Sequence, residues 1–297
     1  MNRVLATGVI GFLLTLPGPH IEGQAGSSGI RGPYFGQSPP GDHPEVFADG
    51  ILEHSHSAPA FSPDGRHVFW CSKRDPNRPG YEVLHMHNEN GTWSAPEYVC
   101  KGFNPFLSVD GEHLYYVSRG LLGSRHLKTR TITDEGLSNA RKTGSPLRSK
   151  HMMWNPTIAA DGTIYLCMFD DDYRNYHEYR LFRSSIMNGR YTDIRQLSEA
   201  INGEGATSPF IAPDRSYLIF GSHRPGGVGD EDLYISYRKP DGDWTEPVNL
   251  GNRINTSGFE DYPRVSPDGR YLFFLRGGHV YWVSTDFIER LKPEHLK

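Results

Sequence analysis

The sequence predicts an all-β protein, a single five-bladed β-propeller. Three observations lead to this prediction: one short pattern recurs five times, its period is close to fifty residues, and each copy contains several short apolar runs. Periods of this length with strands inside them are typical of blades stacked around a ring. Five copies favour five blades over six.

Each copy of the pattern begins with a proline, passes through an Asp-Gly turn and ends in an aromatic-rich run. The anchor prolines lie 46, 51, 53 and 54 residues apart. The turn glycine supplies the positive φ that a tight hairpin needs. The copies are residues 59–65, 105–111, 156–162, 209–215 and 263–269, and the fourth has Arg215 in place of glycine.

Each repeat is expected to form four strands. The first carries the anchor proline, the second is apolar and buried between blades, the third alternates, and the fourth is an outer strand. We expect second strands at 68–70, 114–117, 164–166, 218–220 and 272–275, and third strands at 81–85, 126–130, 179–182, 232–236 and 279–282. Trp93, Tyr191 and Trp244 mark outer strands.

The fifth repeat lacks an outer strand, because residues 284–291 have the pattern of a terminal helical turn. A segment with outer-strand character precedes the first repeat at 43–48. We therefore expect residues 44–52 to complete the last blade and close the ring. Closure removes the exposed strand edges of an open array, whereas an open solenoid would need polar caps at both ends.

The repeats resemble those of the TolB-like β-propellers, a WD-like family of the Pro-Asp repeat type that includes many exported bacterial proteins. The fourth repeat carries the resemblance most clearly, in residues 208–224, Asp232 and residues 242–251. The resemblance covers about residues 43–285 and implies that Asp232 pairs with Arg224. TolB-like propellers usually have six blades and often an additional N-terminal domain, so a role in an envelope complex is not carried over.

The N-terminal residues are expected to direct export. An apolar run over 4–17 follows Arg3, and Gly23 and Ala25 precede a cleavage site after Ala25, which is the layout of a secretory signal peptide. We expect a signal peptide over 1–25, a flexible lead-in over 26–42, the propeller over 43–285 and a C-terminal tail over 286–297. The mature protein is expected in the periplasm or outside the cell, with no membrane span.

The composition excludes several classes of protein. The net charge is −4, so no global field recruits nucleic acid or an anionic membrane. Three cysteines do not make a disulfide framework. Cys71 and Cys167 are expected to be buried, and pairing of Cys71 with Cys100 depends on their distance. The sequence has no Gly-x-Ser-x-Gly elbow and no phosphate-binding glycine loop.

The residues just before the anchor prolines are expected to face the central channel, where propellers commonly bind ligands at one mouth. They mix imidazoles, carboxylates, amides and aromatic rings, which suit a sugar or another polar ligand. The alternative is that they only satisfy one another around a water-filled channel. The candidate ligand-binding residues are His54, His56, Phe103, Asn104, His151, Trp154, Asn155, Glu204, Glu260, Asp261 and Tyr262.

A divalent cation is the weaker alternative for the same region. His54 and His56 are two residues apart, which places both side chains on one face of a strand. His151, Glu260 and Asp261 would complete such a site. No spacing within the chain specifies this set, so we predict no cofactor and no metal site.

We predict a binding or interaction module that holds a protein partner, a carbohydrate or a peptidoglycan-type ligand at the channel mouth. The alternative is a secreted carbohydrate-active enzyme, either a glycoside hydrolase or a lyase. A hydrolase needs inward carboxylates at set separations, and Glu204, Glu260 and Asp261 all come from the last two repeats. This distribution favours the binding module, although the fold alone does not decide between them.

Overall fold

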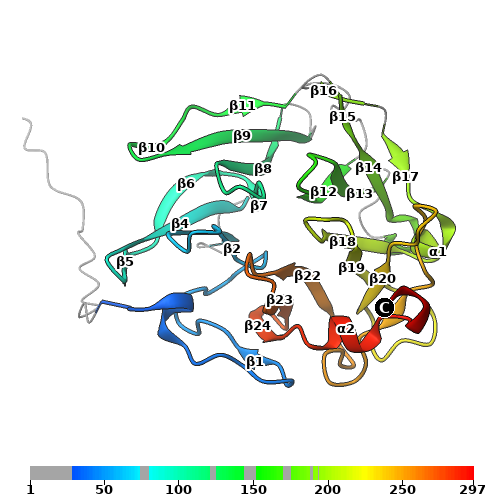
Figure 1. Ribbon diagram of the computed structural model, residues 1–297. Coiled ribbons are helices and arrows are strands. Elements are labelled where there is room, and N and C mark those ends of the chain that lie inside the picture. The colour runs from blue at the N-terminus through cyan, green and yellow to red at the C-terminus, as the bar shows by residue number, and fades with distance from the viewer. Residues whose placement is uncertain are drawn as a thin grey trace, which may run out of the picture.

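Five small antiparallel sheets surround a central axis (Figure 1). The computed structural model describes residues 29–73, 80–120, 125–143, 152–169, 175–187, 190–192 and 194–297. The first strand of each sheet lies nearest the axis and the outer strands lie at the rim (Figure 1). The chain is therefore a five-bladed β-propeller, as the repeats predict.

The first two blades each have five strands. Blade 1 consists of β2 (Ala60–Phe61), β3 (His67–Ser72), β4 (Glu82–Glu89), β5 (Thr92–Trp93) and β6 (Glu97–Lys101). Blade 2 consists of β7 (Phe103–Leu107), β8 (His113–Arg119), β9 (Arg125–Thr133), β10 (Gly136–Leu137) and β11 (Arg141–Lys142).

The other three blades each have four strands. Blade 3 consists of β12 (Met152–Ile158), β13 (Ile164–Phe169), β14 (Arg180–Ser184) and β17 (Arg195–Gln196), with a hairpin of β15 (Ile186–Met187) and β16 (Arg190–Tyr191) beside it. Blade 4 consists of β18 (Ala206–Ile211), β19 (Tyr217–Ser222), β20 (Asp232–Tyr237) and β21 (Val248–Asn249). Blade 5 consists of β22 (Glu260–Val265), β23 (Tyr271–Arg276), β24 (His279–Ser284) and β1 (Glu45–Val46).

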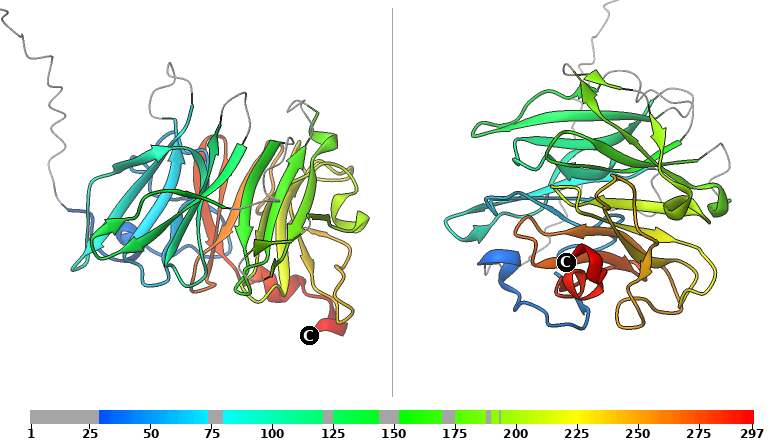
Figure 2. Two further views of the ribbon diagram at one scale, coloured as in Figure 1. Left: turned by 90° about the horizontal axis from the view of Figure 1, so that it is seen from above. Right: turned by 45° about the vertical axis from the view of Figure 1, so that its right-hand side comes forward.

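The helices of the described chain are short. They are η1 (Pro33–Gly36), η3 (Tyr176–Glu178), α1 (Glu199–Asn202), α2 (Phe287–Leu291) and η4 (Glu294–Leu296). The helical turn predicted after the fifth repeat is present as α2, which lies on one face of the disc (Figure 2). No described helix combines the length and the apolar character needed to cross a bilayer.

The N-terminal strand closes the ring, as predicted. β1 pairs antiparallel with β24, so that Glu45 faces Trp282. The backbone N–H of Phe47 then donates to the carbonyl of Val280 at 2.8 Å. The strand is only two residues long, because the chain turns at Ala48, whose φ is 51°. Its main stabilisation comes from the Phe47 side chain, which is 1% exposed.

Five apolar clusters, one at each junction between neighbouring blades, form the core of the described chain. The second strand of each blade contributes to the clusters on both of its faces, which explains why these strands read as continuous apolar runs. Representative pairs across the five junctions are Phe69 with Tyr116, Phe106 with Leu166, Tyr165 with Phe220, Ile219 with Phe274, and Phe61 with Phe273.

The flexible lead-in predicted over 26–42 is corrected for residues 29–42. Phe35 is 9% exposed, and the ring centroid of Tyr34 lies 5.1 Å from that of Phe61. The indole N–H of Trp93 donates to the carbonyl of Gly32 at 2.9 Å. The side chains of Tyr34 and Phe35 therefore fix this segment on the propeller despite its glycine and proline content. Residues 1–28, which include the predicted signal peptide, lie outside the described residues.

One predicted side-chain pair does not form. Asp232 accepts a hydrogen bond from the backbone N–H of Gly229 at 3.0 Å, while Arg224 donates to the carbonyl of Ile201 at 2.8 Å. The predicted pair of Asp232 with Arg224 is therefore wrong for this chain, since each group has a different partner.

The three cysteines are free thiols. Cys71 on β3 and Cys100 on β6 both lie opposite Val83 of β4, on its two sides. Strands are spaced by about 4.8 Å, so the two Cα atoms are roughly 10 Å apart. A disulfide requires Cα atoms within about 7 Å. Cys71 and Cys167 are buried, as predicted.

Removing the Phe47 side chain tests ring closure. Phe47→Ala should lower the free energy of unfolding by about 3–5 kcal/mol, because it leaves a cavity between blades 1 and 5. Urea denaturation of the full chain measures the change. Val46→Ala, at the neighbouring position on β1 but 36% exposed, is the control and should cost less than about 1 kcal/mol. Equal effects of the two substitutions would contradict closure by packing of this segment.

Candidate functional site

The anchor prolines produce bulges in the inner strands. In β7, β12, β18 and β22 the register shifts at the proline and the residue before it. Proline cannot donate to the ladder, so the extra residue is accommodated in a bulge. The preceding residues, Asn104, Asn155, Ser208 and Tyr262, have φ values of 51°, 43°, 46° and 55°. The bulges turn these residues toward the channel.

The middle of the channel is narrow and polar. It holds a cavity of about 20 Å³, which has room for one water molecule but not for a ligand. The Asn155 amide donates to the Ser208 hydroxyl, and the Arg264 guanidinium donates to the carbonyl of Pro105 at 3.0 Å. Burial lowers the pKa of Arg264 to about 10. A ligand bound in the channel would therefore lie at one of its mouths.

A second ring of residues lies where the third strands begin. In each blade the third strand has a buried aliphatic residue that pairs with the second strand. The residue of the second ring lies two positions before that aliphatic residue. The sequence analysis did not predict these positions. They could have been found, because their residue type differs from blade to blade while the surrounding repeat is similar. The ring consists of Tyr81, Arg125, Tyr179, Glu231 and Gly278.

Tyr262 links residues from three blades at the mouth where the inner strands begin. Its hydroxyl accepts a hydrogen bond from the Trp154 indole N–H at 3.2 Å and lies 3.0 Å from Nε2 of His56. The His56 ring stacks on Tyr81, with centroids 4.2 Å apart. Burial lowers the pKa of His56 to about 4 and raises that of Tyr262. Near neutral pH a hydrogen bond therefore joins a protonated Tyr262 hydroxyl to a neutral imidazole.

Arg125 brings a buried cation to the same mouth. Its guanidinium carbon lies 4.3 Å from the ring centroid of Trp154 and 4.9 Å from that of Phe103. Burial lowers the pKa of Arg125 to about 10, so the group remains charged at pH 7. A cation over an aromatic face is stabilised by the ring quadrupole.

Two carboxyl groups with raised pKa values complete the mouth. Burial raises the pKa of Glu231 well above its ordinary value, and the neighbouring Asp261 raises it further. Burial also raises the pKa of Asp261 to about 6, against the effect of a hydrogen bond from Ser208. Oε2 of Glu231 lies 3.4 Å from His223, while Oε1 has no hydrogen-bond partner among the described residues. Burial and the proximity of the two acids therefore both favour the protonated form of this pair.

Gly221 makes room for the Glu231 carboxyl. A Cβ atom at this position would lie 2.2 Å from Oε1 of Glu231. The equivalent residues of the second strand in blades 1 and 3 are Cys71 and Cys167, which have side chains. Glycine inside a strand often marks such a close approach. We call His56, Tyr81, Phe103, Arg125, Trp154, Glu231, Asp261 and Tyr262 together the mouth site.

The channel brings together seven of the eleven residues predicted from the sequence. Three described residues lie elsewhere. His54 and Glu204 are exposed, and Glu260 is fully buried in an ion pair with Arg276 at 2.9 Å. Glu260 precedes Asp261 on one strand, so the two side chains point to opposite faces. His151 lies outside the described residues. The seven residues are His56, Phe103, Asn104, Trp154, Asn155, Asp261 and Tyr262.

Among the described residues, the cation site considered from the sequence is not assembled. His54 is exposed and contributes its backbone carbonyl, which accepts from Ser72 Oγ at 3.2 Å. His56 instead faces Tyr262 through Nε2. The metal-type cluster in the described part of the chain lies at the rim and consists of other residues, His85, His87 and Glu97.

No family model matches the sequence, and no curated protein matches it. Solved structures are similar in fold. TolB from Agrobacterium tumefaciens has a TM-score of 0.49 and 18% identity, with 73% of this chain and 68% of that chain covered. TolB from Acinetobacter baumannii has a TM-score of 0.47 and 14% identity, with 79% and 55% covered.

The chain is itself a β-propeller, as the resemblance of the repeats to TolB-like propellers implies. An enzyme is also among the similar structures. Xylan β-1,4-xylosidase from Bacillus halodurans C-125 has a TM-score of 0.48 and 13% identity, with 79% of this chain and 53% of that chain covered. Similarity at this level concerns the propeller alone, and the chemistry must come from the residues of this chain.

A double-mutant cycle tests the contact between Gly221 and Glu231. Gly221→Ala should lower the free energy of unfolding by about 1–3 kcal/mol, because its Cβ displaces the carboxyl. In the Glu231→Ala background the cost should fall by about 1 kcal/mol or more. Gly258→Ala, where a Cβ meets only Thr256 Oγ1 at 3.7 Å, is the control. Identical costs for Gly221→Ala in both backgrounds would show that Glu231 does not occupy this space.

The raised pKa of Asp261 predicts a pH dependence of stability. The folded chain holds this proton up to about pH 6, whereas the unfolded chain releases it near pH 3.8. The resulting stabilisation is full below about pH 4 and is lost as the pH rises through 6. Urea unfolding of wild type and Asp261→Asn from pH 4 to 7 should show wild type losing stability relative to the variant. The control Asp49→Asn, at an exposed position, should show the same pH dependence of the unfolding free energy as wild type. A difference between wild type and Asp261→Asn that stays constant from pH 4 to 7 would contradict the raised pKa.

Proposed function

We propose that this chain is an exported binding module that holds a polar ligand, of carbohydrate or peptidoglycan type, at the mouth site. The observation that carries the proposal is the convergence of Arg125 and Trp154 with the carboxyl pair of Glu231 and Asp261 at one end of the channel. Pockets for small molecules typically combine aromatic surface with a few placed polar groups.

The chemistry of the mouth suits a polyhydroxylated ligand. Trp154 and Phe103 offer aromatic faces against which the C–H face of a sugar ring can pack. The protonated carboxyl of the pair can donate to a hydroxyl group, and an ionised one can accept from it. One carboxyl oxygen of Glu231 is buried and has no hydrogen-bond partner among the described residues. A ligand that supplies this hydrogen bond would gain binding free energy.

Export is supported by the N-terminal sequence. The apolar run after Arg3 and the small residues Gly23 and Ala25 have the layout of a signal peptide. We propose that the mature chain acts in the periplasm or outside the cell.

A glycoside hydrolase is the second candidate function, and one observation favours it. Glu231 and Asp261 are neighbouring carboxyl groups, and burial raises the pKa of Glu231 well above its ordinary value, the property expected of a general acid. The binding module is preferred because the two carboxyl groups come from the adjacent blades 4 and 5 rather than from around the channel.

Ligand screening of the full chain tests the proposal. Chitooligosaccharides, xylooligosaccharides and muropeptides should be compared by thermal shift and then by calorimetry. A bound glycan should raise Tm, and Asp261→Asn and Trp154→Phe should each weaken its affinity about 10–100-fold. Asp49→Asn is the control and should bind as wild type does.

Three other outcomes would replace the proposal. Turnover of a glycan that is abolished in Asp261→Asn would establish the hydrolase. Binding that is unaffected by both mouth variants would place the ligand elsewhere. Absence of binding to every glycan would leave a protein partner as the ligand class.

A further inference from the structure

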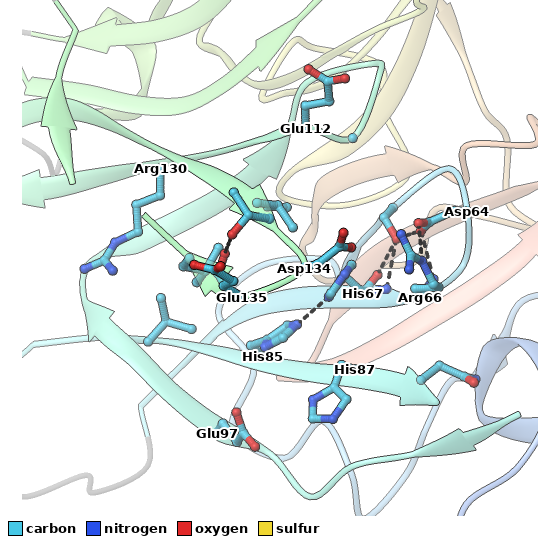
Figure 3. Close-up of a pocket in the computed structure, with 18 of the residues that line it drawn as sticks. Asp64, Arg66, His67, His85, His87, Glu97, Glu112, Arg130, Asp134 and Glu135 are labelled. Carbon is cyan, nitrogen blue, oxygen red and sulfur yellow. Dashed lines mark hydrogen bonds and ion pairs between the residues drawn. The ribbon is translucent and has the colours of Figure 1, made fainter. Parts of the chain in front are cut away.

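A groove at the rim of the propeller collects three imidazoles and a carboxylate, away from the channel (Figure 3). It lies between the outer strands of blades 1 and 2 and has a volume of about 920 Å³. His85 and His87 lie two residues apart on β4, so they face the groove together. The pairing of β4 with β6 places Glu97 directly opposite His85.

His85, His87 and Glu97 have the arrangement of a metal centre. One ligand atom from each residue lies within 4.8 Å of the other two. In a tetrahedral zinc site with bonds of about 2.0–2.2 Å, the ligand atoms are about 3.3–3.5 Å apart. Glu97 is exposed and His87 is half-buried, so small side-chain rotations bring the three atoms to that spacing. Two His and one Glu leave a fourth position open, as in other three-ligand zinc sites.

His67 fixes the orientation of His85. Nδ1 of His67 lies 2.9 Å from Nε2 of His85. The Phe69 ring stacks on the His85 ring with centroids 4.4 Å apart. This hydrogen bond engages Nε2 and leaves Nδ1 of His85 for a metal ion. Histidine ligands typically have their second nitrogen held in this way. Nε2 of His87 similarly lies 3.6 Å from a carboxylate oxygen of Glu89.

The charge around the groove favours a cation. Its walls carry seven carboxylates, including those of Asp134 and Glu135, and only two guanidinium groups, those of Arg66 and Arg130. Arg66 is already paired with Asp64 at 2.7 Å. The excess of negative charge concentrates cations at the groove. This feature is independent of the spacing of the three ligands.

We propose that His85, His87 and Glu97 bind a divalent transition-metal ion, with His67 as a positioning residue. Zinc is the expected ion, because two imidazoles with one carboxylate are a common zinc ligand set. The fourth position faces the groove, where a water molecule or an anionic group of a ligand can complete the coordination. The site is separate from the channel and does not depend on the function proposed for the mouth.

Calorimetry on the full chain tests the site. After dialysis against EDTA and then chelator-free buffer, titration with zinc chloride should give one ion per chain with a Kd of about 1 μM or below. Zinc should also raise Tm, since it binds the folded chain. Magnesium chloride should do neither, because Mg²⁺ requires oxygen ligands.

Variants separate this site from adventitious binding. Glu97→Gln and His87→Gln keep the shape of the residue and should each weaken zinc binding more than about tenfold. His67→Ala should weaken it about 10–100-fold at unchanged stability in urea, and His67→Asn, which keeps a hydrogen-bonding group, should recover part of the loss. His279→Ala, an exposed histidine on β24, is the control and should bind as wild type does.

Two results would overturn the proposal. One is the absence of both heat and a rise in Tm for wild type at about 0.1 mM zinc. The other is zinc binding that is the same in wild type, Glu97→Gln and His87→Gln, since all three chains would then use other groups. Circular dichroism of each variant confirms that the comparison is made on folded protein.

Discussion

A proline in the innermost strand of each blade is the constraint on which the channel depends. Proline cannot donate a backbone hydrogen bond, so four of the five inner strands bulge at this position and the preceding residue adopts a positive φ. Asparagine tolerates this conformation well, and two of the four residues are asparagine. Ser208 and Tyr262 adopt it at a greater cost, which the closed ring of blades must offset.

The bulges separate what is common to the blades from what is particular to each. The prolines and the Asp-Gly turns recur because every blade needs them, whereas the residues before the prolines and at the start of the third strands differ. Tyr262, at the bulge of blade 5, contacts Trp154 of blade 3 and His56 of blade 1 at the channel mouth. Arg215 shows the same principle at the opposite face, since it replaces a turn glycine and pairs with Asp161 of the neighbouring blade at 2.9 Å.

The sequence was sufficient for the fold and for part of the candidate site. Repeats specify the five blades and the ring closure, because each copy has the same apolar runs. Eleven residues before the prolines were predicted to line the channel, and seven of them lie there, since the inner strand is identified by its proline. Glu260 instead pairs with Arg276, because strand alternation is disrupted beside a bulge and the sequence does not give the facing of each residue.

Other features depend on contacts between blades that no local pattern records. Glu231 was absent from the prediction because its burial depends on Gly221, which is ten residues earlier in the chain. The packing of Tyr34 and Phe35 was missed because their partners belong to blades 1 and 5. The alternation of His85 and His87 was visible, but their pairing with Glu97 requires the register of β4 with β6.

The indole N–H resonances of the protein test the central claim most directly. The chain has five tryptophans, of which Trp154 lies at the mouth, while Trp93 and Trp244 belong to outer parts of the blades. During titration with a glycan that raises Tm, the Trp154 resonance, assigned with Trp154→Phe, should move and the other four should not. A ligand-induced shift of Trp93 or Trp244 with an unmoved Trp154 would contradict a binding site at the channel mouth.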